Sequence, residues 1–134
     1  MNTPQTMHRS PCPLSTALDL IGDKWSLLIV RDMCMNKSKY CDFQNSPEAI
    51  PTNILASRLR KLESNGIIVK HPYQTKPIRH EYYLTAKGAA LLPVIQQLAI
   101  WAHQHMPDSL PPPEAFLSAK PEDLIRKRDN QSSV

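Results

Sequence analysis

Polar and basic side chains gather on one face of a helix predicted between Pro51 and Asn65. With successive residues placed about 100° apart, Asn53, Ser57 and Arg60 fall on one side and the leucines on the other. Arginine can bind guanine and asparagine can bind adenine through paired hydrogen bonds, each worth about 1–3 kcal/mol of base discrimination. The pattern therefore predicts a helix that packs through one face and contacts DNA bases through the other. An ordinary solvated face is the alternative.

Further residues of this helix are candidates for contacts with DNA. Thr52 lies at the N-terminal end, which enters the groove first in helix-turn-helix proteins. Lys61 flanks the polar face and is predicted to hold a phosphate. Arg58 lies at the margin of that face, where it could contact a phosphate or pair with an acid inside the domain.

A predicted β-hairpin follows the helix directly. Ile67–His71 and Glu81–Thr85 are rich in β-branched and aromatic residues, which is typical of strands. The segment between them, Pro72–His80, is polar and longer than a tight turn needs, and it contains Lys76 and Arg79. A basic loop of this kind can place cations on phosphates or in the minor groove, so we expect it to form the wing of a winged helix. An ordinary exposed hairpin loop is the alternative.

Charge is distributed unevenly along the chain. The whole chain of 134 residues has a formal net charge of only +4. Residues 51–90 contain seven basic and two acidic residues, which gives this region a net charge of +5. Such clustering is typical of a phosphate-binding face.

The helices predicted around this unit are short and amphipathic, and they complete a mainly α fold with a small β-hairpin. Asp23 is placed to cap a helix over 24–35, and Ser38 to cap a shorter one over 39–45. Gly66 is the expected C-terminal stop of the 51–65 helix. A long helix is predicted from residue 85 or 86 to His105, with a kink or a short first segment at Pro93.

These patterns together resemble one family. The segments CPLSTALDLIGDKWSLLIVRDM, IPTNILASRLRKLESNGII, YYLTAKGAALLPVI and LAIWAHQH resemble, in order and spacing, the HxlR-type winged helix-turn-helix transcriptional regulators, which are related to the MarR group. The resemblance covers Pro11 to His105. It implies a homodimer that binds double-stranded DNA at a pseudo-palindromic operator.

The resemblance also implies roles for residues outside the helix and the hairpin. The family's dimer interface corresponds here to residues 12–20 together with the helix through Leu91, Leu98 and Trp101. Some members sense oxidants or electrophiles through a cysteine at the position of Cys12. Cys12 is therefore the candidate redox sensor, and a small residue buried at an interface is the alternative.

The chain is expected to form one domain over residues 11–106. A mobile arm (1–10) precedes it, and a proline-rich linker (107–113), a short helix (121–128) and a tail follow it.

Other kinds of protein are disfavoured by the composition. Three cysteines without paired spacing argue against a secreted disulfide framework and favour the cytoplasm. No apolar run approaches the roughly 20 residues of a membrane span. His103 and His105 lie two apart on a helix and make no metal site alone, and no catalytic constellation stands out. We expect no cofactor, no metal and no enzymatic activity.

Two alternatives stay open from the sequence. The first is a winged helix that binds another protein in place of DNA; acidic or large apolar groups on the polar helix face would indicate it, and that face has neither. The second is a regulator with a small-molecule pocket between the dimer helix and the core, near Trp25, Trp101 and Tyr83.

Overall fold

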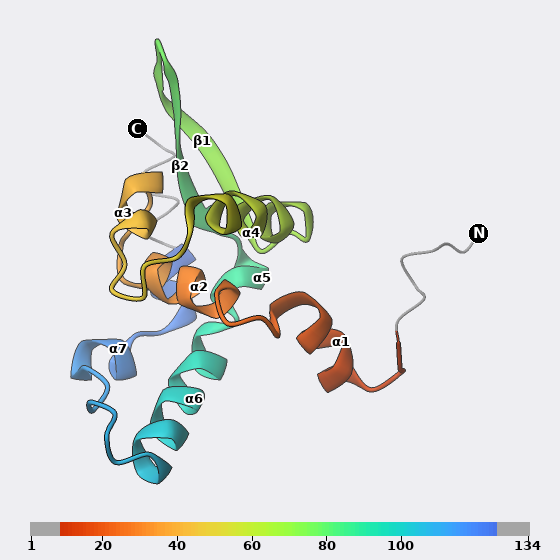
Figure 1. Cartoon of the computed structure of the whole chain (residues 1–134), viewed down its shortest axis with the longest axis vertical. Coiled ribbons are helices and arrows are strands. Elements are labelled where there is room, and N and C mark those ends of the chain that lie inside the picture. The colour runs from red at the N-terminus through yellow and green to blue at the C-terminus, as the bar shows by residue number, and fades with distance from the viewer. Residues whose placement is uncertain (1–8, 126–134) are drawn as a thin grey trace.

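A computed structural model describes residues 9–125 of the chain (Figure 1). The elements in chain order are α1 (Pro13–Ile21), α2 (Ser26–Cys34), α3 (Tyr40–Gln44), α4 (Thr52–Ser64), β1 (Ile68–Thr75), β2 (Ile78–Leu84), α5 (Ala86–Ala89), α6 (Leu92–His105) and α7 (Glu114–Ser118). Most of the arm predicted for residues 1–10, and the chain after residue 125, lie outside the described residues. The predicted mainly α architecture with one β-hairpin is confirmed.

The core lies where α2, α3, α4 and α6 meet the base of the hairpin. Val30, Phe43, Leu55, Leu62 and Leu92 contribute side chains with no accessible surface. They come from helices far apart in sequence, so burying them fixes these helices relative to one another. By contrast, α1 projects away from this body, and Figure 1 shows it reaching out to one side.

Helix α4 begins and ends much as the sequence predicts. Pro51 is the residue before its first turn, and Gly66 follows its C-terminal end in the left-handed conformation, with φ of 76°. A side chain at Gly66 would be strained there, which is why glycine ends the helix and lets the chain enter β1.

Capping of the earlier helices agrees with the prediction at one position and differs at another. Asp23 accepts hydrogen bonds from the backbone N–H groups of Trp25 and Ser26, both at 3.0 Å, and so caps the start of α2 as predicted. The prediction that Ser38 caps α3 is wrong. Asp42 lies one turn inside the helix and accepts from the N–H groups of Ser38 and Lys39, because a carboxylate there satisfies two unpaired donors.

The hairpin is longer and its turn tighter than the sequence indicates. Strands β1 and β2 pair antiparallel as far as Thr75 and Ile78, so the expected nine-residue loop is wrong. The register shifts between Pro72 and Gln74, where one extra residue is accommodated. Proline lacks the N–H of a regular ladder, and a local irregularity lets the strand pass it and continue to the tip.

The hairpin is also tied to the body by the segment before α3. The Tyr82 N–H donates to the Ser38 carbonyl at 2.7 Å, and Lys39 and Glu81 form an isolated antiparallel bridge. The Tyr82 ring meets Phe43 edge to face, with ring centres 6.2 Å apart. These contacts orient the hairpin relative to the helices.

The interruption expected at Pro93 is confirmed. The chain forms two helices, α5 and α6, and Pro93 lies in the first turn of α6, where its missing N–H would have no partner. Thr85 caps α5 by accepting from the Gly88 N–H at 3.0 Å.

The residues directly after the predicted linker (107–113) form α7, and Phe116 of this helix is buried in the main core. Gln96 on α6 donates to the carbonyl oxygens of Phe116 and Ala119, both at 2.9 Å. The proline content suggests a spacer, but one aromatic side chain and one amide are enough to dock the segment. Residues 121–125 are helical, as predicted, and the rest of the helix predicted to 128 lies outside the described residues.

Candidate nucleic-acid interface

Helix α4 presents two chemically different faces. Leu55, Leu59 and Leu62 are buried in the core. On the opposite side Asn53 and Arg60 are exposed. Burial of the leucines fixes the rotation of the helix, so its polar groups are held outward.

The Arg60 guanidinium is available for a ligand. Within residues 9–125 it makes no ion pair or hydrogen bond, and neither does the Asn53 amide. Arginine offers five N–H donors in a planar fork, and asparagine offers both donors and an acceptor. This part of α4 can therefore bind base edges without first breaking internal contacts.

Arg58, by contrast, is held inside the domain. Its Nε donates to Asp23 Oδ2 at 3.0 Å, and its Nη1 donates to the Ser57 hydroxyl at 3.2 Å. Of the two roles that the sequence leaves open for Arg58, the structure places it in the internal pair. The Ser57 hydroxyl, acting as acceptor here, keeps its own O–H to donate outward.

Asp23 is the anchor that joins α4 to the start of α2. Partial burial raises its pKa, but hydrogen bonds from the Ser26 side chain, the Trp25 backbone and Arg58 outweigh this, and its pKa falls to about 2. The carboxylate therefore stays ionised at neutral pH. It ties α4, which carries Asn53 and Arg60, to the start of α2.

We expect Asp23→Asn to destabilise the fold by on the order of 1–2 kcal/mol, because a pKa lowered from 3.8 to about 2 sets the upper limit and solvent screens part of it. Because the folded-state pKa is lowered, this stabilisation is complete above pH 3.8 and disappears as the pH falls toward 2. Urea unfolding of both proteins at neutral pH and at acidic pH would measure it. If Asp23→Asn lowers the free energy of unfolding by the same amount at neutral pH and near pH 2, the ionised Asp23 carboxylate is not the source of the stabilisation.

Lys61 and Thr52 also have contacts within the domain. Lys61 Nζ donates to the Asp19 carbonyl at 3.0 Å, at the C-terminal end of α1, where a cation is favoured. Thr52 is exposed, and its carbonyl accepts from the Tyr40 hydroxyl at 3.1 Å. Lys61 thus links α4 to α1, and Thr52 presents its side chain at the first turn of α4.

The hairpin tip carries two exposed cations beyond the body of the domain. Figure 1 shows β1 and β2 extending well past α4. Lys76 and Arg79 lie at this end, and among residues 9–125 neither makes an ion pair. Nearer the base, Lys70 lies 3.9 Å from Glu63, so that cation is partly neutralised. The free positive charge of the hairpin is at its tip.

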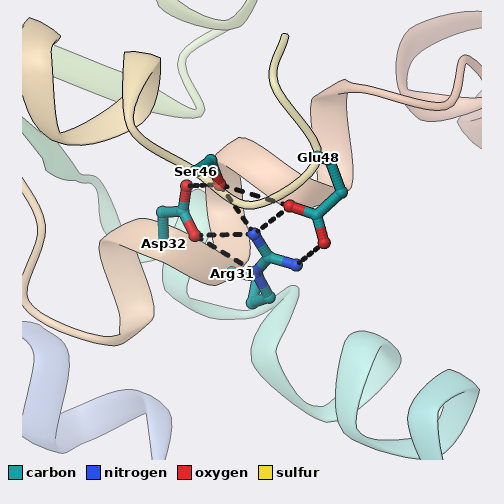
Figure 2. A network of polar contacts seen from close by, with 4 residues as sticks. All are labelled: Arg31, Asp32, Ser46 and Glu48. Atoms are coloured by element: carbon teal, nitrogen blue, oxygen red, sulfur yellow. Dashed lines mark hydrogen bonds and ion pairs between the residues drawn. The ribbon is translucent and has the colours of Figure 1, made fainter. Parts of the chain in front are cut away.

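A polar network that the sequence does not reveal holds the turn before α4. Figure 2 shows Arg31 of α2 between Asp32, Ser46 and Glu48. The guanidinium donates to Glu48 Oε2 at 2.7 Å and to Asp32 Oδ1 at 2.9 Å, and the Ser46 hydroxyl donates to Asp32 Oδ2 at 2.8 Å. The hydrogen bond from Arg31 is the main reason that the pKa of Glu48 falls to about 2. An arginine followed by an aspartate on a helix gives no sequence signal for this role.

Comparison with known proteins decides the class of the domain. The sequence model of the HxlR-like helix-turn-helix family matches residues 20–110. The chain belongs to the HxlR-like helix-turn-helix family. It is 33% identical over 94 residues to the uncharacterised HTH-type transcriptional regulator YdeP of Bacillus subtilis, covering 70% of this chain and 73% of YdeP.

Solved structures of similar sequence share this fold. The candidate transcription factor PA1607 is 38% identical, with a TM-score of 0.68 over 76% of this chain and 72% of PA1607. The redox regulator HypR in its oxidised form is 32% identical, with a TM-score of 0.64 over 69% of this chain and 96% of HypR. This HxlR-like protein is thus a helix-turn-helix transcriptional regulator of a DNA-binding, non-enzymatic family, as predicted.

The cysteines of the HxlR-like chain differ in accessibility. Cys12 and Cys41 are exposed, whereas Cys34 is largely covered, and all three are free thiols. Burial raises the pKa of Cys34 to about 12, which makes it a poor nucleophile. Cys12 is the residue immediately before the first turn of α1, next to the surface predicted to form the dimer.

That predicted surface is apolar and uncovered in the single chain. On α1, Leu14 and Leu18 are 66% and 51% exposed. On α6, Val94, Leu98 and Trp101 are 43%, 49% and 53% exposed and fall on one side of the helix. Ile21 alone is buried among the residues of α1, so this helix has little contact with its own domain.

The pocket predicted near Trp25, Trp101 and Tyr83 is not where the structure has its large cavity. A groove of about 820 Å³ lies between α2, α6 and the segment after α6, and none of those three residues lines it. Trp25 borders a void of only about 10 Å³. Docking of the C-terminal segment, which the sequence does not indicate, creates the larger space. Among residues 9–125, no helix is long and apolar enough to cross a membrane, and no group of side chains is arranged to hold a metal ion.

Proposed function

We propose that the protein binds a pseudo-palindromic DNA operator as a homodimer. One α4 helix would enter the major groove of each half-site, with Asn53, Ser57 and Arg60 on base edges. The observation that carries this is Arg60, an exposed arginine without an ion-pair or hydrogen-bond partner among residues 9–125, on a helix whose opposite face is fixed in the core.

Phosphate contacts would come from residues around this centre. We assign them to Thr52 at the first turn of α4 and to Lys76 and Arg79 at the hairpin tip, which are exposed. Lys61 can add a contact at the edge of α4, whereas Arg58 serves to hold the helix through Asp23. The uncovered apolar residues of α1 and α6 would form the dimer interface, since large exposed apolar patches mark interaction sites.

Selection of bound fragments from genomic DNA by the purified protein tests this function. We expect enrichment of sites with two similar half-sites whose centres lie about one helical turn, or a multiple of it, apart. Binding should weaken steeply with salt, because each phosphate contact releases counterions. Failure to enrich any sequence over bulk DNA would contradict the proposal.

We also propose that Cys12 senses oxidants or electrophiles. Its support is an exposed thiol at the start of α1, beside the proposed dimer surface, and the similarity to the redox regulator HypR. An oxidant of the hypochlorite class would accept two electrons and two protons from the Cys12 thiols of two subunits as a disulfide forms between them. With a quinone, the Cys12 thiolate would instead add to a ring carbon, and protonation would leave a hydroquinone bound through a thioether.

Cys12→Ser is expected to keep operator binding and to lose its response to quinone or hypochlorite. Gel shifts before and after treatment would measure this. Cys41→Ser is the matched control, because Cys41 is also an exposed free thiol and should leave the response intact. A normal response from Cys12→Ser would remove this residue from the sensing mechanism.

A further inference from the structure

The groove between α2, α6 and the C-terminal segment is a built cavity of ligand size. Its volume of about 820 Å³ lies within the roughly 300–1,000 Å³ of small-molecule sites. Most of its lining is apolar: Leu28 and Met35 come from α2 and its end, Ala99 and Ala102 from α6, and Phe116 from α7. Small residues on α6 leave the space open, and larger side chains there would fill it.

One wall of this groove is a feature of this chain beyond the matched family region. The family match ends at residue 110, whereas Pro111, Pro112, Pro113 and Phe116 line the groove. Gln96 holds this wall in place through its hydrogen bonds to carbonyl groups of α7 and the residue after it. Consecutive prolines limit the freedom of the wall, so the cavity is shaped before any ligand enters.

Two cations and two acids are the charged groups of the lining. Arg31, Asp32 and Glu48 line the groove and are paired with one another, as Figure 2 shows. Lys37 also lines it and makes no ion pair among residues 9–125. Lys37 is therefore the charged group of the lining that a bound anion could pair with without displacing an existing ion pair, and the apolar lining would take an apolar body beside it.

We propose that this groove binds an apolar carboxylic acid, with the carboxylate against Lys37 and the apolar body between α2, α6 and the proline wall. The site is distinct from the α1 and α6 surface assigned to the dimer, although Leu98 borders both. Ala99 and Ala102 face the groove, while Val94 and Trp101 lie on the neighbouring side of α6.

Occupation of the groove would reach α4 through the turn before it. Glu48 and Arg31 belong both to the lining and to the network that holds this turn. Displacing Glu48 by a bound molecule would loosen the chain that enters α4 at Pro51. This regulatory step rests on the proposed DNA binding, whereas ligand binding itself does not.

Calorimetric titration of the full chain without DNA tests the site directly. The probes are 2-naphthoate and octanoate, each beside its uncharged amide. We expect both acids to bind more tightly than their amides. Lys37→Gln should weaken the acids by about five- to tenfold, in line with about 1 kcal/mol for one charge contact, and leave the amides unchanged. Lys120→Gln is the matched control, because Lys120 is exposed and does not line the groove.

A second variant separates this site from a self-association surface. Ala102→Phe should fill the groove and abolish binding of acids and amides, with the circular dichroism spectrum and the oligomeric state unchanged. The chemical class is wrong if acids and amides bind equally or if Lys37→Gln has no effect. The ligand site is wrong if no probe binds, or if Ala102→Phe changes the mass seen by light scattering, since a second copy would then cover the groove. Gel shifts with 2-naphthoate are made only after calorimetry has established ligand binding. If the protein fails to bind DNA, the calorimetric result for the groove is unaffected.

Discussion

Trp101→Glu is expected to convert the protein to monomers and to lower its operator affinity by on the order of 10²–10⁴-fold. Trp101 is 53% exposed on α6, in line with Val94 and Leu98, and the apolar side of α1 is equally uncovered. A carboxylate there would be buried without a partner in the proposed apolar interface, which is costly. A monomer can hold only one half-site, so the gain from linked binding is lost.

Light scattering and gel shifts on the same preparations measure both parts of this effect. Leu117→Glu is the matched control, since it also places a carboxylate at an exposed apolar position, but on α7. It should remain dimeric and bind the operator normally. If Trp101→Glu stays dimeric, the interface lies elsewhere. If it becomes monomeric with full affinity, pairing of half-sites is not the basis of binding.

The helices that carry the candidate site can be predicted from interactions between residues close together in the sequence. The leucine spacing of α4, the stop at Gly66 and the cap at Asp23 each depend on residues within a few positions of one another. The interruption at Pro93 has the same local origin. For this reason the amino-acid sequence alone assigns the two faces of α4, with Leu55 inward and Arg60 outward.

Features that depend on distant partners cannot be derived in the same way. Arg58 can pair with Asp23 only after folding has brought together two residues that are 35 positions apart in the sequence. Docking of Phe116 and the extension of β1 past Pro72 are decided by surfaces that exist only in the folded protein. The Arg31 network and the groove beside it have the same origin, so the candidate regulatory features are the least visible in the sequence.

Arg60→Ala is expected to lower affinity for the selected operator by about 10- to 100-fold and to leave binding to unrelated DNA nearly unchanged. A bidentate arginine–guanine contact contributes about 1–3 kcal/mol of discrimination, and it is absent at non-specific sites. Arg60 has no internal ion pair among residues 9–125, so removing it should not destabilise the domain. Unchanged urea unfolding would establish that the loss concerns DNA alone.

Lys76→Ala provides the matched comparison, because it removes one exposed cation from the hairpin tip. A phosphate contact carries no sequence information, so affinity should fall on every DNA and the salt dependence should become shallower by about one counterion. The two variants must therefore differ in the ratio of specific to non-specific binding, which falls only for Arg60→Ala. Equal losses on all sequences for both variants would mean that Arg60 binds phosphate, and the contacts that distinguish bases would then have to come from Asn53 and Ser57.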